Sequence, residues 1–195
     1  MGNRRWTFLV LVYILLLCPL HAIGFSEQPK YAPKLEFLTG YGAARIKQKG
    51  VYHVIPLFVD VNFDLTTLLE KHKIRFPCSL TFVVEPFISY VYTHTRNVEV
   101  GNNFAFKIGF LPETSRFQPY FKGGSGPMFM SQHTREQGTQ FNFNDFGALG
   151  VHYFFTKTAA LTFEYRFRHI SNAEIKKPNR GIDSHFGLCG IVFLF

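Results

Sequence analysis

Hydrophobic and polar residues alternate along most of the chain from Lys34 onward. In "NFAFKIGF" every second residue is a large apolar one, at Phe104, Phe106, Ile108 and Phe110, and the residues between them are small or charged. The same alternation runs through "SLTFVVEPFISY", "VYHVIPLFVDVNF" and "LTFEYRFR". A period of two is typical of strands that have different environments on their two faces. The pattern therefore predicts an all-β protein.

Eight strands are predicted, approximately over residues 35–46, 51–64, 79–92, 102–111, 117–130, 140–154, 158–171 and 184–195. The segment 65–73 interrupts the alternation and predicts a short helix after the second strand. No internal repeat or linker divides the chain, and its length fits one domain.

Charged residues occupy the face opposite the aromatic one in several predicted strands; they include Asp60, Glu85, Glu164, Arg166 and Arg168. The interior of an eight-stranded barrel is just wide enough for side chains to fill, so these residues are expected to form a buried ionic network. A soluble barrel would instead turn its apolar face inward. The last strand ends in "GIVFLF", which resembles the C-terminal assembly signature of bacterial outer-membrane proteins. These observations predict an eight-stranded antiparallel transmembrane β-barrel of the outer-membrane type.

The first residues have the pattern of a secretory signal peptide. Arg4 and Arg5 precede an apolar run over residues 6–17, and Ala22-Ile23-Gly24 offers small residues for cleavage. We therefore expect residues 1–24 to be removed near Ala22 or Gly24, leaving residues 25–195 as the barrel domain. A lipoprotein cleavage site before Cys18 is the alternative, although the small residue expected ahead of that cysteine is missing.

Composition agrees with a membrane barrel. The chain is 47% hydrophobic and 17% aromatic, whereas charged residues make up only 17%, below the roughly 25% of soluble domains. The formal net charge of +8 comes without a cluster of basic and stacking aromatic residues, so nucleic acid is not an expected partner. The charge fits either contact with anionic lipid head groups or ordinary loop Lys and Arg residues, and both interpretations stay open. No later run reaches 18 apolar residues, so no transmembrane helix is predicted. Cys78 and Cys189 lie in separate predicted strands and are expected to remain thiols.

The polar segment "RHISNAEIKKPNRGID" lies between the last two predicted strands. Apolar residues of the strand 158–171 stand at odd positions, and continuing the strand puts His169 and Ser171 on the same lipid-facing side. Counting back from Phe195 places Asp183 on that side too, provided that no bulge intervenes. If the chain ends are periplasmic, this loop faces the cell exterior. Paired strands then bring the three residues within about 5 Å of one another.

These residue types suit ester hydrolysis. A serine hydroxyl becomes a nucleophile when a histidine takes its proton, and an acid on the other ring nitrogen orients the imidazole. Asn172 offers a side-chain amide and a backbone N–H for the oxyanion, and residues 178–181 have turn chemistry. Polar residues on a lipid-facing wall suggest function, although residues just above the hydrocarbon edge cost little. Both interpretations stay open on the residues alone.

The string "HISNA", followed by Ile175, Pro178-Asn179, Gly181-Ile182 and an acid at position 183, resembles the signature of the PagL family of lipid A 3-O-deacylases. The resemblance implies an eight-stranded outer-membrane barrel that hydrolyses the ester-linked acyl chain at position 3 of lipid A. It implies no metal and no cofactor. By the family's motif, Ser171 is the nucleophile, His169 the base, and Asn172 part of the oxyanion hole.

The chain departs from the family pattern at two positions. Asp183 stands where glutamate is usual and is one methylene shorter, and Glu174 replaces a glycine. Glu174 is the alternative acid, although we expect it to be a solvated loop charge. His185 shares the outward parity of Asp183 and is a candidate accessory contact. The remaining histidines show no spacing typical of metal ligands.

The leading hypothesis is an outer-membrane serine esterase with a Ser-His-acid triad that removes the 3-O-linked acyl chain of lipid A, with its active site facing the outer leaflet. Lipopolysaccharide and outer-membrane lipid are the expected partners, and a homodimer is among the open oligomeric states. Two alternatives remain: a non-enzymatic small outer-membrane barrel with a degenerate site, and an outer-membrane phospholipase.

Overall fold

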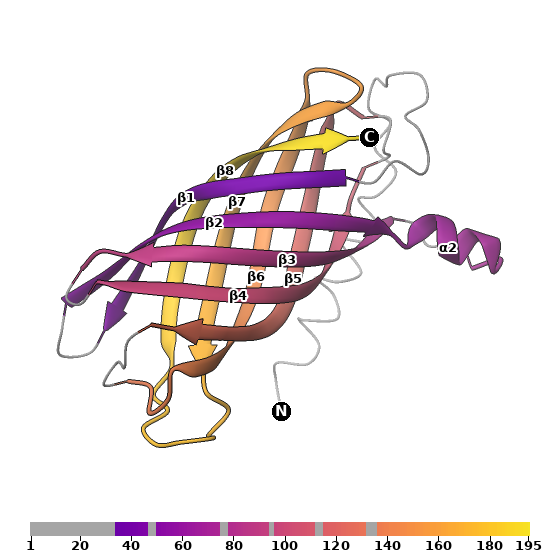
Figure 1. Ribbon diagram of the computed structural model, residues 1–195. Helices are drawn as coiled ribbons and strands as arrows, with labels where there is room; N and C mark the ends of the chain where they lie inside the picture. The colour runs from indigo at the N-terminus through magenta and orange to yellow at the C-terminus, as the bar shows by residue number, and fades with distance from the viewer. Residues whose placement is uncertain (1–33, 47–49, 75–77, 94–95, 112–114, 132–135) are drawn as a thin grey trace, which may run out of the picture.

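The computed structural model describes residues 34–46, 50–74, 78–93, 96–111, 115–131 and 136–195. Its elements are the strands β1 (Lys34–Ile46), β2 (Gly50–Asp64), β3 (Ser79–Val91), β4 (Asn97–Gly109), β5 (Phe117–Met130), β6 (Phe141–Phe154), β7 (Ala159–Ser171) and β8 (Ile182–Leu194), and the helix α2 (Thr66–Lys71). Each strand pairs antiparallel with the next, and β8 pairs with β1, so the sheet closes into a barrel. Figure 1 shows the tilted strands, with α2 extending beyond the end that holds the C-terminus.

The predicted fold class is confirmed, and so are most strand boundaries, which lie within two residues of the expected ones. The exception is β4, which begins at Asn97 and not at residue 102. Asn97 and Glu99 are buried while Val98 and Val100 are exposed, so the alternation continues through this segment with polar residues inside. The predicted helix over 65–73 appears as α2.

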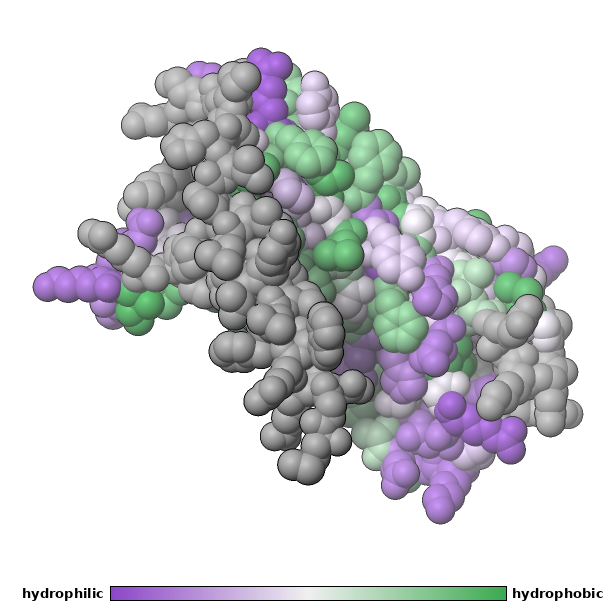
Figure 2. Space-filling view, turned by 180° about the vertical axis from the view of Figure 1, so that it is seen from behind, coloured by the Kyte–Doolittle hydropathy of each residue, from purple (hydrophilic) through white to green (hydrophobic). Residues whose placement is uncertain are grey.

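The outer wall of the barrel is apolar. Phe104, Phe106 and Phe163 are 48%, 53% and 58% exposed, and many other aromatic and aliphatic side chains stand beside them. Figure 2 shows green side chains over the uncovered part of one face, with purple side chains among them and gathered at the lower right. A contiguous apolar surface of this extent is stable in lipid and not in water. The barrel is therefore of the outer-membrane type.

The interior holds the predicted ionic network. Lys122 Nζ lies 2.8 Å from Asp60, 3.0 Å from Glu85 and 3.1 Å from Glu164. The Arg166 guanidinium binds Glu85 and Glu164, each at 2.7 Å, and Arg168 Nη1 binds Glu99 at 2.7 Å. All of these residues are buried. Because a buried charge without a partner is costly, the pairs make the barrel interior rigid and fix which side chains point inward.

The start of β1 and the end of β8 lie at the end of the barrel opposite the site loop. Lys34 pairs with Leu194 at one end, while the connection between β7 and β8 is at the other, where His169 pairs with Asp183. Cys78 and Cys189 form no disulfide among the described residues, as expected. The predicted signal peptide and the alternative site at Cys18 lie outside the described residues.

Among the residues that the structure describes, no helix is long and apolar enough to cross a bilayer.

Candidate active site

His169 and Asp183 form a hydrogen-bonded pair on the outer wall. They are direct cross-strand partners on β7 and β8, and His169 Nδ1 lies 2.6 Å from Asp183 Oδ1. The two side chains are 42% and 63% exposed. The outward parity expected for both residues is confirmed, and the shorter aspartate does reach the imidazole. Since an ionised carboxylate only accepts, Nδ1 is the donor, and a neutral ring then keeps Nε2 as an acceptor.

Ser171 lies two residues beyond His169 on the same face of β7, opposite Phe143 of β6. It is half-buried. Its hydroxyl makes no hydrogen bond to any residue that the structure describes. The structure thus joins His169 to Asp183 and leaves Ser171 beside them without a bond to the imidazole. Contacts between a nucleophile and its base often tighten only when substrate binds.

Asn172 is buried and holds the site loop together. Its backbone N–H donates to Asn179 Oδ1 at 2.9 Å, and its side-chain amide donates to the carbonyls of Lys176 at 2.7 Å and Pro178 at 3.3 Å. These bonds employ the donors that were expected to serve the oxyanion. The structure shows Asn172 ordering the loop. Its role in the oxyanion hole stays a prediction, and it would require Asn172 to give up one of these loop hydrogen bonds.

The loop after Ser171 contains residues in the left-handed region of the backbone. Ala173 and Glu174 have φ angles of 49° and 62°. This conformation favours glycine, so Glu174 keeps a backbone shape that suits the residue it replaces in the family string. The Glu174 side chain is exposed, as expected for a solvated loop charge.

Gly181 has a φ of 71°, and a Cβ added there would lie 2.6 Å from His169 Cε1. The glycine therefore lets the loop pass directly against the imidazole ring. This close approach to Cε1, the ring atom between Nδ1 and Nε2, helps to fix the orientation of the imidazole.

A second loop supports the first. Gly138 N donates to the Pro178 carbonyl at 2.7 Å, and Arg180 N donates to the Glu136 carbonyl at 3.0 Å. The Gln137 side chain donates to the carbonyl of Ile170 at 3.2 Å. No motif marks these residues in the sequence, because most of the bonds use backbone atoms.

Asp145 is a charged residue of the site that the sequence reasoning missed. It lies on the outer face of β6 directly opposite His169, on the side away from Asp183. Its Oδ1 accepts a hydrogen bond from Ser125 Oγ of β5 at 2.5 Å. The sequence could have identified this position, because Asp145 alternates in step with Phe141 and Leu149, which share the outer face of β6.

His185, the candidate accessory residue, lies one outward position below Asp183 on β8. Its Nδ1 is 2.7 Å from the Tyr165 hydroxyl, and its ring centroid is 5.3 Å from that of Phe167. Its recorded contacts are thus with aromatic residues of the wall. Contact of His185 with a substrate stays a prediction.

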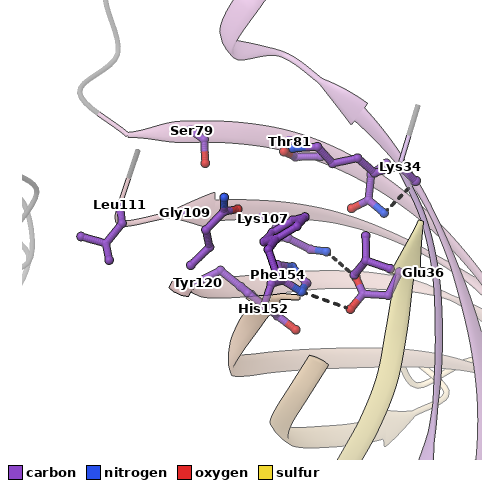
Figure 3. A pocket seen from close by; sticks show the side chains of 13 residues that line it. Lys34, Glu36, Ser79, Thr81, Lys107, Gly109, Leu111, Tyr120, His152 and Phe154 are labelled. Atoms are coloured by element: carbon purple, nitrogen blue, oxygen red, sulfur yellow. Dashed lines mark hydrogen bonds and ion pairs between the residues drawn. The ribbon is translucent and has the colours of Figure 1, made fainter. Parts of the chain in front are cut away.

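A cavity of about 40 Å³ lies at the opposite end of the barrel (Figure 3). Its lining includes Glu36, which binds Lys107 Nζ at 2.7 Å and accepts from Thr162 at 2.7 Å, and also includes His152. The volume suits a few water molecules and is far too small for a lipid. The wall around His169 is therefore the better candidate site.

Comparisons with solved structures bear on the fold. A crystal structure described as that of the outer membrane enzyme PagL is 19% identical to the chain, with a TM-score of 0.56, and covers 80% of this chain and 97% of that one. The crystal structure of Neisserial surface protein A (NspA) is 15% identical, with a TM-score of 0.63, and covers 84% and 97%. At these identities the likeness shows the fold alone.

Sequence comparison adds the family. No curated protein matches the chain. The family model described as lipid A 3-O-deacylase (PagL) matches residues 58–191, a span that contains His169, Ser171 and Asp183. Because this span is more than half of the chain, the chain belongs to the PagL family of lipid A 3-O-deacylases.

Proposed function

We propose that the protein is an outer-membrane serine esterase that hydrolyses the 3-O-linked acyl chain of lipid A. The observation that carries the proposal is the His169–Asp183 bond of 2.6 Å on the outer wall, next to Ser171 and within the span matched by the family. Lipid A resides in the membrane, so a site on the lipid-facing wall can receive its ester without removing the lipid from the bilayer.

The proposed reaction runs through an acyl-enzyme. Ser171 Oγ attacks the ester carbonyl carbon while its proton passes to His169 Nε2. The bond between the carbonyl carbon and the 3-oxygen breaks, and the departing oxygen takes the proton from Nε2. Water then attacks the acylated Ser171 with His169 again as base, which releases a fatty acid and regenerates the serine.

Each neighbour of Ser171 has a defined part in this scheme. Asp183 keeps the Nδ1 proton in place, so that Nε2 is the acceptor when the ester arrives, and it stabilises the imidazolium. Asn172 orders the loop and is the candidate oxyanion donor. The two steps require Ser171 and His169 to come within hydrogen-bond reach, a change that side-chain rotation on the exposed wall can provide.

Location follows from the same proposal. We place the loop between β7 and β8 at the outer leaflet, because both termini of an outer-membrane barrel with an even number of strands lie on the periplasmic side. Residues 1–24 are the proposed export signal, and residues 25–195 the mature domain.

Mass spectrometry of lipids from expressing cells tests the proposal. Cells that carry the wild-type protein should contain lipid A that lacks one ester-linked acyl chain, whereas cells that carry Ser171→Ala should not. Thr39→Ala removes a hydroxyl from the same outer wall at β1, far from the loop, and should behave as the wild type. Trimmed phospholipids with intact lipid A would identify a phospholipase, and unchanged lipids in all strains would favour a barrel with a degenerate site.

A further inference from the structure

The connection between β2 and β3 projects from the rim of the barrel at the end opposite the site loop. Residues 65–74, which we call the rim segment, hold α2 and the turn that ends it, and Figure 1 shows α2 extending outward beyond the ends of β2 and β3. The segment is tied to the barrel at its start, where Leu65 N donates to the Leu80 carbonyl at 2.9 Å and Leu80 N donates to Thr66 Oγ1 at 2.7 Å. Most of the segment beyond this attachment is exposed.

Apolar side chains are among the exposed ones. Leu68 and Ile74 are 51% and 53% exposed. The helix ends in two hydrogen bonds, from Lys73 N to the Glu70 carbonyl at 2.9 Å and from Ile74 N to the Leu69 carbonyl at 3.0 Å. This pair of bonds is the Schellman motif, which turns the chain back against the last turn of its helix. The exposed apolar residues therefore belong to one short stretch of surface.

Basic side chains share this stretch. Lys71, His72 and Lys73 follow one another at its outer end and are exposed. Lys73 has a φ of 62°, at the position of the motif that glycine usually occupies, so the turn carries a charged side chain where none is required by the backbone. Two lysines against Glu70 give residues 68–74 a formal charge of +1. The outer end of the segment is thus both apolar and basic.

We propose that the rim segment lies among the head groups of the bilayer and binds anionic phospholipid. Lys71 and Lys73 meet the phosphates of the lipid. Leu68 and Ile74 reach the edge of the acyl chains. Under the orientation given above, the lipid belongs to the periplasmic leaflet. The inference goes beyond the proposed hydrolysis and does not depend on it.

Continuity with the lipid-facing wall supports this occupant. Phe63 is the last outward residue of β2, is 50% exposed and packs against Phe82 of β3 with ring centroids 6.4 Å apart. The rim segment begins two residues after Phe63, so it leaves the barrel at the edge of the apolar wall. An apolar and basic segment at this height meets head groups first, and phospholipid phosphates complement its charge.

The proposed contact uses two additive effects. Amphipathic segments in the interface bury their apolar residues about 5–10 Å into the boundary between head groups and acyl chains, while long lysine side chains extend back to the phosphates. Each lysine near an anionic surface contributes about 1 kcal/mol, or about fivefold in the ratio of bound to unbound segment. This electrostatic part weakens as salt is added.

Fluorescence from a single tryptophan tests the proposal. Trp6 is the only tryptophan of the chain, so Trp6→Phe combined with Leu68→Trp leaves one indole, on the apolar side of α2. The purified protein is reconstituted into vesicles of phosphatidylcholine, with or without phosphatidylglycerol, in which part of the phosphatidylcholine is brominated near the head group or near the chain end. Glu70→Trp, also with Trp6→Phe, is the matched control, because helical residues two apart point to nearly opposite sides.

The indole of Leu68→Trp should be quenched more by bromine near the head group than by bromine at the chain end, and more than the indole of Glu70→Trp. Phosphatidylglycerol should increase this quenching, salt should reduce the increase, and adding Lys71→Gln and Lys73→Gln should abolish it. Heat-dependent mobility in gels verifies that every form holds a folded barrel.

Equal quenching of Leu68→Trp and Glu70→Trp overturns the inference. Quenching that is the same with and without phosphatidylglycerol also overturns it, because an apolar contact would then exist without the anionic head group. Protection of the indole only after a periplasmic extract is added would assign the segment to a protein partner instead of lipid. If Leu68→Trp does not fold, Ile74→Trp makes the same measurement from the other exposed apolar position. Lipid A trimming is not measured, so these results leave the proposed function to its own test.

Discussion

Replacing Asp183 tests the acid of the proposed triad, because asparagine and glutamate change opposite properties. Asparagine keeps the size of the side chain and removes its charge. Glutamate keeps the charge, adds one methylene and restores the residue that is usual in the family. The contact at risk is the 2.6 Å bond between Asp183 Oδ1 and His169 Nδ1.

The size of the effect follows from the geometry and the exposure. Two unit charges at about 4 Å interact by about 4 kcal/mol at an effective dielectric constant of about 20. His169 and Asp183 are 42% and 63% exposed, so water screens the pair. If about half of the interaction survives, the loss is about 2 kcal/mol, or roughly thirtyfold in kcat. Asparagine can also favour the wrong tautomer of the imidazole, an effect worth about 10⁴-fold in serine proteases.

We therefore expect Asp183→Asn to lower kcat by at least thirtyfold, and Asp183→Glu to retain or raise it. The assay is the release of fatty acid from lipid A, quantified by mass spectrometry, with retention of the folded barrel checked by heat-dependent mobility in gels. Equal rates in all three forms would remove Asp183 from the mechanism. Glu174→Gln, made in parallel, would then show whether the alternative acid carries the role.

Two further variants test the support of the site. Gly181→Ala should lower kcat by up to about 10²-fold, because the added Cβ would lie 2.6 Å from His169 Cε1. In the control variant Gly187→Ala the added Cβ has nothing within 4 Å, so lipid A trimming should be unchanged. Equal rates in both variants would refute the argument from this close contact. Lys122→Met should destabilise the barrel by about 3–5 kcal/mol in urea unfolding from lipid vesicles, because it removes the close partner of the buried Asp60 and leaves Glu85 and Glu164 with Arg166 alone. An unchanged midpoint would show that Lys122 is dispensable for stability.

Period-two alternation predicted most of the fold because the two faces of each strand lie in different environments, lipid outside and the packed interior inside. Lipid selects apolar residues outside and paired charges fill the narrow interior, so each strand carries the signal along its whole length. The predicted start of β4 was too late. Val98 and Val100 face outward and Asn97 and Glu99 inward ahead of Gly101, so the alternation already marks the strand from Asn97.

The same parity predicted that His169 and Asp183 would share a face and meet across β7 and β8. It could not predict the loop between them. The bonds of Asn172 to Asn179, Lys176 and Pro178 depend on a backbone path that includes left-handed residues, and no periodicity describes such a path. The position of Asp145 on the outer face was predictable in principle from the alternation of β6.

Strand register connects the buried network to the site on the wall. In the observed pairing of β7 with β8, Arg168 lies opposite Ser184 and His169 opposite Asp183. A shift of β7 by one residue would turn every side chain to the other face and expose Arg166 and Arg168 to lipid. Each arginine would then cost up to about 2–4 kcal/mol at the membrane centre and lose its carboxylate partner. The register that satisfies the buried arginines is therefore the one that places His169 beside its acid, so the ionic interior stabilises the geometry of the exposed site.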